Sequence, residues 1–349
     1  MAIGNLKPMC GVDNLSIHKK LWKNQELFQS FVAGMKLIIA FFRLVRSLNL
    51  FFIVLTQALF YYCVIPFAVR NISHLSNPFL QPKLFWLLCL ASLLIAAAGY
   101  IINDYFDLNI DRVNKPERLV VDTVINRRWA ILWHWLLSFT GVIISFYVSW
   151  KLNNWVIGLA NAGCVFVLML YSTTFKKKIL IGNFIISTLT SWVILVLFLA
   201  EWDLNIGAGG GVQSAMGKLF KFAIVYAGFA FIISMVREVV KDIEDMEGDA
   251  RYQCRTMPIV WGVNVSKIYA AVWLAVLLSA IIILQFYVLQ YRWWWSIIYS
   301  IVLIIAPIAW IIYKLYRANN KQDYHRLSNA IKLVMMTGLL SMIFFKLYT

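Results

Sequence analysis

The acidic residues that could bind a metal ion are concentrated in two short stretches of the sequence. Of the 16 Asp and Glu residues, four lie in 103–118 and six in 237–249. Each stretch contains three oxygen-bearing side chains at intervals of three or four residues, a spacing that places them on one face of a helix. They are Asn103, Asp107 and Asp111 in the first stretch, and Asp242, Asp245 and Asp249 in the second. Because stacked carboxylates repel one another, we expect a cation between them, and this type of ligand suits Mg²⁺ completed by substrate phosphates.

Basic and polar side chains occur near both acidic stretches and near the ends of other apolar segments. Individually, each basic residue is typical of a cytoplasmic flank that faces anionic lipid. Together with carboxylate-bound Mg²⁺, they predict a diphosphate site, and its position beside apolar segments favours an isoprenoid diphosphate. The candidates for substrate binding are Arg46, Asn49, Lys115, Arg118, Tyr171, Lys176, Lys177, Arg251 and Arg255.

The segments that must position these residues have the composition of membrane helices. The chain has 349 residues, of which 62% are hydrophobic and 14% are charged, whereas a soluble domain is about 45–50% apolar and about 25% charged. Long apolar runs predict an all-α, polytopic membrane protein with nine spans, because a helix needs about 20 apolar residues to cross a bilayer. The predicted spans are 48–69, 84–102, 129–150, 154–172, 180–200, 219–240, 264–290, 293–316 and 327–348.

The distribution of Lys and Arg predicts the orientation of these spans. With the N-terminus in the cytoplasm, 23 basic residues flank the cytoplasmic ends of the spans and seven flank the opposite ends. This bias predicts an integral protein of the plasma (inner) membrane with both acidic stretches on the cytoplasmic side. Residues 1–36 are expected to form a polar cytoplasmic arm, and residues 37–349 the nine-helix domain.

Two other classes of site are disfavoured by the same composition. A formal net charge of +16 would suggest nucleic acid in a soluble protein, but here no soluble basic face exists to carry it, so no nucleic-acid partner is expected. The five cysteines are scattered without a Cys-x-x-Cys pair, which disfavours a zinc site or a disulfide framework.

From about Arg43 onward, the chain resembles the UbiA superfamily of intramembrane prenyltransferases. The two acidic stretches match the two aspartate-rich signatures of that superfamily, and the segment from Tyr171 to Asn183 is similar to the one after its fourth span. Within the superfamily, residues 114–118 (Asn-Lys-Pro-Glu-Arg) and 241–259 resemble digeranylgeranylglyceryl phosphate synthases.

The resemblance implies a nine-helix UbiA-type bundle and Mg²⁺-dependent prenyl transfer. It implies that the six residues at the two signatures hold Mg²⁺ on the diphosphate and that Asp107, Asp111, Asp245 and Asp249 are catalytic. It also implies that Arg46, Lys176 and Arg118 neutralise the leaving diphosphate. The implied donor is a polyprenyl diphosphate, with geranylgeranyl diphosphate as one candidate, and the acceptor is lipophilic.

Three functions remain open on the sequence alone. The first is transfer to a prenylglycerol phosphate, for which Arg251 and Arg255 would bind the acceptor's phosphate. The second is prenylation of an aromatic quinone precursor of the 4-hydroxybenzoate, homogentisate or naphthoate type. The third, from another class, is transport or binding of a lipid phosphate, although acids at one membrane face favour an enzyme over an alternating-access site at the midplane.

Overall fold

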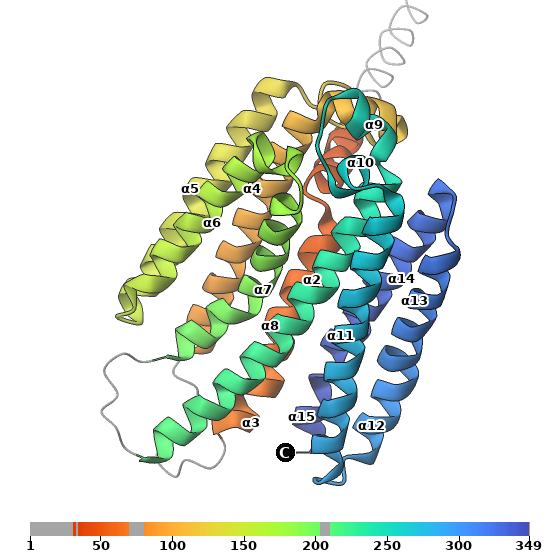
Figure 1. Ribbon diagram of the computed structural model, residues 1–349. Coiled ribbons are helices and arrows are strands. Elements are labelled where there is room, and N and C mark those ends of the chain that lie inside the picture. Colours follow the sequence, from red (N-terminus) through yellow and green to blue (C-terminus); the bar gives the residue numbers. More distant parts are fainter. Residues whose placement is uncertain (1–30, 33, 70–79, 203–209, 349) are drawn as a thin grey trace, which may run out of the picture.

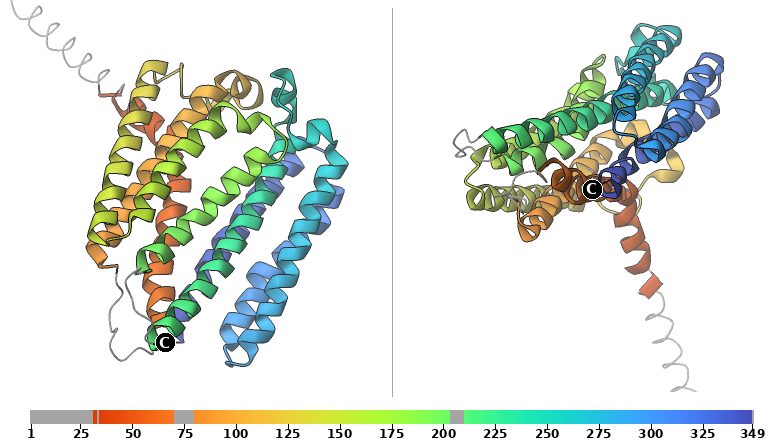
Figure 2. Two further views of the ribbon diagram at one scale, coloured as in Figure 1. Left: turned by 60° about the vertical axis from the view of Figure 1, so that its left-hand side comes forward. Right: turned by 90° about the horizontal axis from the view of Figure 1, so that it is seen from below.

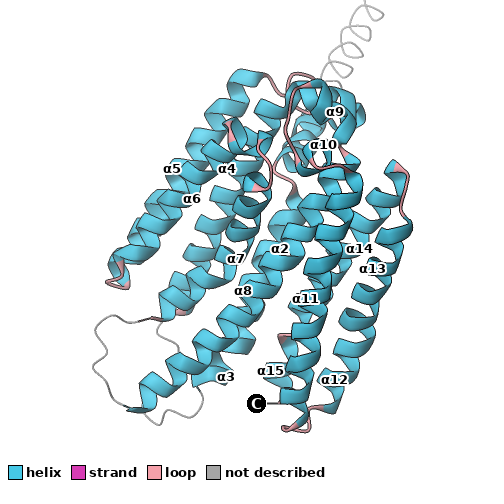
Figure 3. Ribbon diagram, in the orientation of Figure 1, coloured by secondary structure: helices cyan, strands magenta, loops and turns pink. Residues whose placement is uncertain are grey.

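A computed structural model of the protein describes residues 31–32, 34–69, 80–202 and 210–348. Within these ranges the chain is built from helices, and the only strand-like feature is an isolated bridge between Val121 and Ile125 (Figure 3). The predicted arm falls largely on residues outside the described ranges. Residues 34–44, which include the end of the predicted arm, are helical and lead into the first span.

The described residues contain nine helical segments that are long and apolar enough to cross a membrane, which confirms the predicted number. Two of the segments contain a single π-helical turn and are therefore divided: the first into α2 and α3, the eighth into α12 and α13. The spans are α2–α3 (Ser47–Val69), α4 (Pro82–Asn114), α5 (Arg127–Lys151), α6 (Trp155–Thr173), α7 (Ile181–Glu201), α8 (Gly210–Glu244), α11 (Val263–Leu289), α12–α13 (Trp294–Arg317) and α14–α15 (Lys321–Leu347).

Helices α4 and α8 are longer than the apolar runs that predicted them. They comprise 33 and 35 residues and continue beyond their apolar portions into the two acidic stretches. An apolar run ends at the first acidic residue, but the backbone hydrogen bonds of a helix do not depend on apolar side chains. The extra turns carry the acidic side chains on rigid helices rather than on loops.

The helices stand side by side as one elongated bundle (Figure 1). Helices α5 and α6 lie at one side and α11 to α14 at the other, with α2, α7 and α8 between them, and the views in Figure 2 agree. The short helices α9 (Met246–Arg251) and α10 (Met257–Val260) lie at one end of the bundle, and the C-terminus lies at the other. We call the end with α9 and α10 the motif end.

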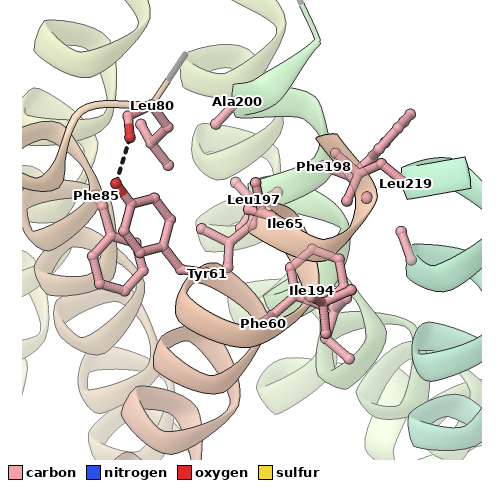
Figure 4. Close-up of a cluster of buried hydrophobic side chains, with 14 of the residues drawn as sticks. Phe60, Tyr61, Ile65, Leu80, Phe85, Ile194, Leu197, Phe198, Ala200 and Leu219 are labelled. Carbon is pink, nitrogen blue, oxygen red and sulfur yellow. Dashed lines mark hydrogen bonds between the residues drawn. The ribbon is translucent and has the colours of Figure 1, made fainter. Parts of the chain in front are cut away.

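The largest buried apolar cluster lies toward the opposite end from the motif end, around α2, α3, α7 and α8 (Figure 4). There Tyr61 stacks on Phe85 with 4.1 Å between ring centroids, and its hydroxyl donates a 2.6 Å hydrogen bond to the carbonyl of Leu80. A second cluster joins α8, α11, α13 and α14. These clusters close the far end and one side of the bundle, so that polar side chains are concentrated at the motif end.

Candidate active site

One large cavity, of about 1060 Å³, connects the two acidic stretches with the apolar interior of the bundle. Along α4 its walls extend from Ser92 to Asn114, which corresponds to about 33 Å of helix at 1.5 Å per residue. Along α8 they extend from Phe229 to Asp242. The cavity is therefore long, with carboxylates at the motif end and mainly apolar side chains deeper in the bundle.

All six predicted metal-binding residues line this cavity, as do five of the predicted substrate-binding residues. The six are Asn103, Asp107, Asp111, Asp242, Asp245 and Asp249, and the five are Arg46, Asn49, Lys115, Tyr171 and Lys176. Tertiary packing thus brings together residues from four separate segments of the chain, 46–49, 103–115, 171–176 and 242–249.

In the first acidic stretch, Asp107 is the most enclosed carboxylate. It is 4% exposed and accepts a 2.7 Å hydrogen bond from Asn103 Nδ2 on the same face of α4. Lys176, on the short helix η3 (Phe175–Lys177), forms an ion pair with its Oδ2. Burial acts to lower the pKa of Lys176, but the adjacent Asp107 carboxylate outweighs it, so the net shift is upward and the ammonium stays charged.

Arg46 occupies the corner where the chain enters α2. Its backbone is left-handed, with φ of 51°, a conformation that is uncommon for a residue other than glycine. Its guanidinium donates to Asp104 Oδ1 at 2.7 Å and lies 5.2 Å from the centre of the Tyr100 ring. The corner therefore directs this cation toward α4, where the first acidic stretch lies.

The spacing of the second acidic stretch suggested one uninterrupted helix, but the structure divides the stretch between two helices. Helix α8 ends at Glu244, and Asp245 forms a turn before α9 begins at Met246. Asp245 Oδ2 accepts a 2.6 Å hydrogen bond from Lys115, and Asp242 Oδ2 accepts one of 2.8 Å from Asn183. The break changes the direction of the chain, but all three aspartates still face the cavity.

Asp249, on α9, is 6% exposed. Burial, aided by the negative charge of Asp245 and opposed by Lys176, raises the pKa of Asp249 to about 6. The charged form of this carboxylate is thus disfavoured by its surroundings, and a nearby cation would stabilise it.

Asn114 connects the two stretches. Its Nδ2 donates to the carbonyl of Asp245 at 3.0 Å, and its Oδ1 accepts from the backbone N–H of Gly248 at 2.9 Å. Asn114 is the last residue of α4, so these two hydrogen bonds attach the end of the first motif helix to the turn and first residues of the second. This attachment fixes the distance between the two carboxylate groups.

The donor set fits Mg²⁺, although within the described part of the chain no three Asp, Glu, His or Cys side chains are close enough to hold a metal by themselves. Mg²⁺ commonly uses only one or two carboxylates and takes its other ligands from water and substrate phosphates. Two oxygens here are buried without a hydrogen-bond partner, Asn103 Oδ1 and Asp245 Oδ1, one on each motif. An oxygen left in this state costs about 1–3 kcal/mol, a cost that a bound cation would offset.

Three of the remaining predicted binding residues are not brought to the cavity. Lys177, Arg251 and Arg255 are exposed and are not among the lining residues, and Arg251 pairs with Glu247 at 2.7 Å on the outer face of α9. The side chain of Arg118 lies outside the described part of the structure. Their roles in binding therefore stay predictions.

Four cations that line the cavity were missed by the sequence analysis. Arg43 and Lys241 flank predicted spans, whereas Arg237 on α8 and Lys332 on α14 lie inside predicted spans. The signal was present, because only six of the 32 basic residues fall inside the predicted spans, and Arg237 and Lys332 are two of them. An ionisable residue inside a span is costly and is by default a functional candidate.

Comparison with known proteins agrees with this geometry. Residues 63–336 match the UbiA prenyltransferase family. The chain belongs to this family. It is therefore an integral membrane prenyltransferase with a nine-helix UbiA-type fold, as the described residues show directly.

Individual UbiA relatives agree with the assignment. The chain is 31% identical to a digeranylgeranylglyceryl phosphate synthase of Methanosphaera stadtmanae over 247 residues, which are 70% of this chain and 81% of the relative. A solved structure described for digeranylgeranylglyceryl phosphate synthase superposes with a TM-score of 0.58 at 24% identity, covering 88% of this chain and 98% of the other. A UbiA homologue from Archaeoglobus fulgidus, solved with DMAPP and Mg²⁺, gives 0.50 at 15% identity, covering 87% and 99%.

The attachment at Asn114 leads to a prediction for this UbiA protein. In Gly248→Ala, the new Cβ would overlap the side-chain amide of Asn114. We expect the overlap to lower the free energy of unfolding by about 1–3 kcal/mol. Alanine is the better helix former, which offsets part of this loss. The overlap should also displace the second motif. A displacement of about 1 Å can reduce prenyl transfer roughly 10²-fold. Thermal unfolding and initial rates in detergent measure both effects.

Gly163→Ala on α6 is the matched control, because no atom lies within 4 Å of its Cβ position. It should retain wild-type rates, with a stability equal to or slightly above that of the wild type because alanine is the better helix former. Wild-type turnover by Gly248→Ala would show that the connection between the motifs does not position the site.

Proposed function

We propose that this protein transfers a polyprenyl group from its diphosphate to the hydroxyl of a prenylglycerol phosphate, with Mg²⁺ and with geranylgeranyl diphosphate as the candidate donor. The large cavity supports this proposal, because its carboxylates and cations at the motif end continue into a deep apolar region. Such a cavity can accommodate a diphosphate and its attached chain together. The similarity to digeranylgeranylglyceryl phosphate synthases supports the choice of acceptor.

Mg²⁺ bound by the six motif residues would polarise the diphosphate and neutralise charge on the leaving oxygens. The residues of the chain would do the rest of the binding and orientation. Lys176, Lys115 and Arg46 lie directly beside motif carboxylates and present ammonium and guanidinium groups to a diphosphate. The apolar walls enclose the prenyl chain and keep water from the reacting carbon.

In the proposed reaction, the bond between the prenyl C1 and the diphosphate oxygen breaks, and its electron pair leaves with the diphosphate. The hydroxyl oxygen of the acceptor forms an ether bond to C1, and its proton passes to the departing diphosphate. The aromatic rings of Tyr100 and Tyr171 line the cavity beside the motifs, where a ring face can stabilise positive charge that develops on the prenyl carbon.

Because the chain belongs to a prenyltransferase family, an enzyme is favoured over a transporter of lipid phosphates. An experiment with several acceptors distinguishes a prenylglycerol phosphate from an aromatic acceptor. Purified protein is supplied with geranylgeranyl diphosphate, Mg²⁺ and a panel containing geranylgeranylglyceryl phosphate, 4-hydroxybenzoate and homogentisate, and the products are identified by mass spectrometry. Ether formation on the glycerol lipid supports the proposal, and prenylation of a phenolic acid alone refutes it.

We further propose that the motif end faces the cytoplasm, in the plasma (inner) membrane. The charge bias and the placement of both motifs at one end of the bundle support this orientation. In a Cys10→Ser background, cysteines introduced at Lys178 and Arg317 should react with an impermeant maleimide only from the cytoplasmic side. A cysteine at Tyr291, in the turn between α11 and α12, should react only from the other side. The reverse pattern would overturn the orientation.

A further inference from the structure

Three basic side chains that form no ion pair with a candidate metal-binding carboxylate lie near one another in the cavity. They are Arg237 and Lys241 on α8 and Lys332 on α14, and all three line the cavity. We call this group the α8–α14 basic cluster. Lys332 donates a 3.0 Å hydrogen bond to Asn49 Oδ1 on α2, which connects the cluster to the helix that follows Arg46.

The cluster carries more positive charge than its surroundings neutralise. Its neighbouring carboxylate is Glu238, which lies 3.0 Å from Arg237 and 3.7 Å from Lys241. Lys332 has no carboxylate partner within the described residues, and its ammonium lies 5.3 Å from the centre of the Phe52 ring. The nearby Arg46 adds another positive charge, which Asp104 already pairs.

This excess charge lies at positions where charge is costly. Lys332 is eleven residues into the ninth span, so that it lies about 16 Å along the helix from Lys321. Arg237 Nε is buried and has no hydrogen-bond partner. A buried donor without an acceptor and a cation without a counter-ion both indicate that an anion completes the cluster.

The diphosphate does not account for this anion, because the motifs already supply their own cations. Lys176 pairs with Asp107 and Lys115 with Asp245, at the positions where Mg²⁺ and the diphosphate are expected. An acceptor that carries a phosphate brings a second anion into the same cavity. A phosphomonoester has a charge of about −1.5 to −2 near neutral pH, which matches two or three cations opposed by one carboxylate.

We infer that the α8–α14 basic cluster binds the phosphate group of the acceptor, with Lys332 as a specificity-determining residue. This inference rests on the proposed function, since it assigns a site to the acceptor's phosphate. It replaces Arg251 and Arg255 in that role, because those two side chains are exposed and do not line the cavity.

The test measures steady-state kinetics with both substrates varied, using geranylgeranyl diphosphate as donor and geranylgeranylglyceryl phosphate as acceptor. Lys332→Met removes the charge with little change of volume. We expect the KM for the acceptor to rise about ten- to hundred-fold, the effect of losing a charge-assisted hydrogen bond, while the KM for the donor stays near the wild-type value. Lys332→Arg should restore most of the acceptor affinity.

A second measurement identifies the group that is recognised. Geranylgeranylglycerol, the same acceptor without its phosphate, should be a poorer substrate for the wild-type protein, and Lys332→Met should lose this discrimination by a similar factor. Lys314→Met, which removes an exposed lysine on α13, is the control and should behave as wild type. If Lys332→Met has no turnover, binding of the two acceptors can be compared instead by how far each raises the temperature of thermal unfolding of the variant.

The outcomes separate the two proposals. If the wild-type protein does not use geranylgeranylglyceryl phosphate, the proposed function fails and this inference with it. If the wild-type protein uses it and Lys332→Met leaves the acceptor's KM unchanged, only the inference fails. It also fails if Lys332→Met raises the KM for the donor instead, or if Arg255→Ala raises the acceptor's KM and Lys332→Met does not.

Discussion

Asp107→Ala and Asp245→Ala are each expected to reduce prenyl transfer by at least about 10²–10³-fold, comparable to the loss of a transition-state stabiliser in other enzymes. Each variant removes the central carboxylate of one acidic motif. Both carboxylates face the same cavity, and each already contacts a lysine that is positioned to meet the diphosphate. Initial rates of diphosphate release with saturating Mg²⁺ measure the effect.

Removing Asp107 also leaves Lys176 beside the cavity without its carboxylate partner, which can lower stability as well as activity. Asp107→Asn and Asp245→Asn separate the two effects, because the amide retains the size of the side chain and an acceptor oxygen. We expect them to lose comparable activity while unfolding near the wild-type temperature. Glu247→Ala is the control, since this acid lies in the second stretch but is exposed and outside the cavity lining. Wild-type rates in either Asp→Asn variant would contradict a site built from both motifs.

Lys176→Met should have a similarly large effect, about 10²–10³-fold on kcat, because it removes a fixed cation from the place where negative charge increases on the leaving diphosphate. Lys176 is the only one of the three consecutive lysines 176–178 that lines the cavity within the described structure. The loss should not be recovered at lower pH, because methionine cannot be protonated. In the wild-type protein, burial opposes the charge of Lys176, but the adjacent Asp107 carboxylate raises the pKa of its ammonium.

Lys178→Met provides the matched comparison, two residues away in the same segment. Its side chain is exposed, with its ammonium 5.3 Å from the centre of the Phe175 ring. Kinetics at several Mg²⁺ concentrations would distinguish the proposed role of Lys176 from a purely structural one. If Lys176→Met lowers activity only through a lower melting temperature, or if Lys178→Met is equally impaired, the assignment of Lys176 to the leaving group is wrong.

The sequence by itself determined the membrane class, the number of spans found in the described residues and the position of the candidate metal-binding residues. Apolarity over about 20 residues is a local property, so that each span could be identified without knowledge of its neighbours. The same holds for Asn103, Asp107 and Asp111, whose spacing of four residues places them on one face of α4 wherever that helix packs. The concentration of ten of the 16 acidic residues in two stretches was also visible in the chain alone.

Only the tertiary structure decided which cations face the cavity. Arg251 and Arg255 follow the second motif closely in sequence, but the break at Asp245 and the short helix α9 leave them on the outside. Lys332 lies 283 residues from Asn49 and still forms a hydrogen bond with it. Local spacing determines the face of a helix on which a side chain lies, whereas the partner of that face depends on packing between helices that are far apart in sequence.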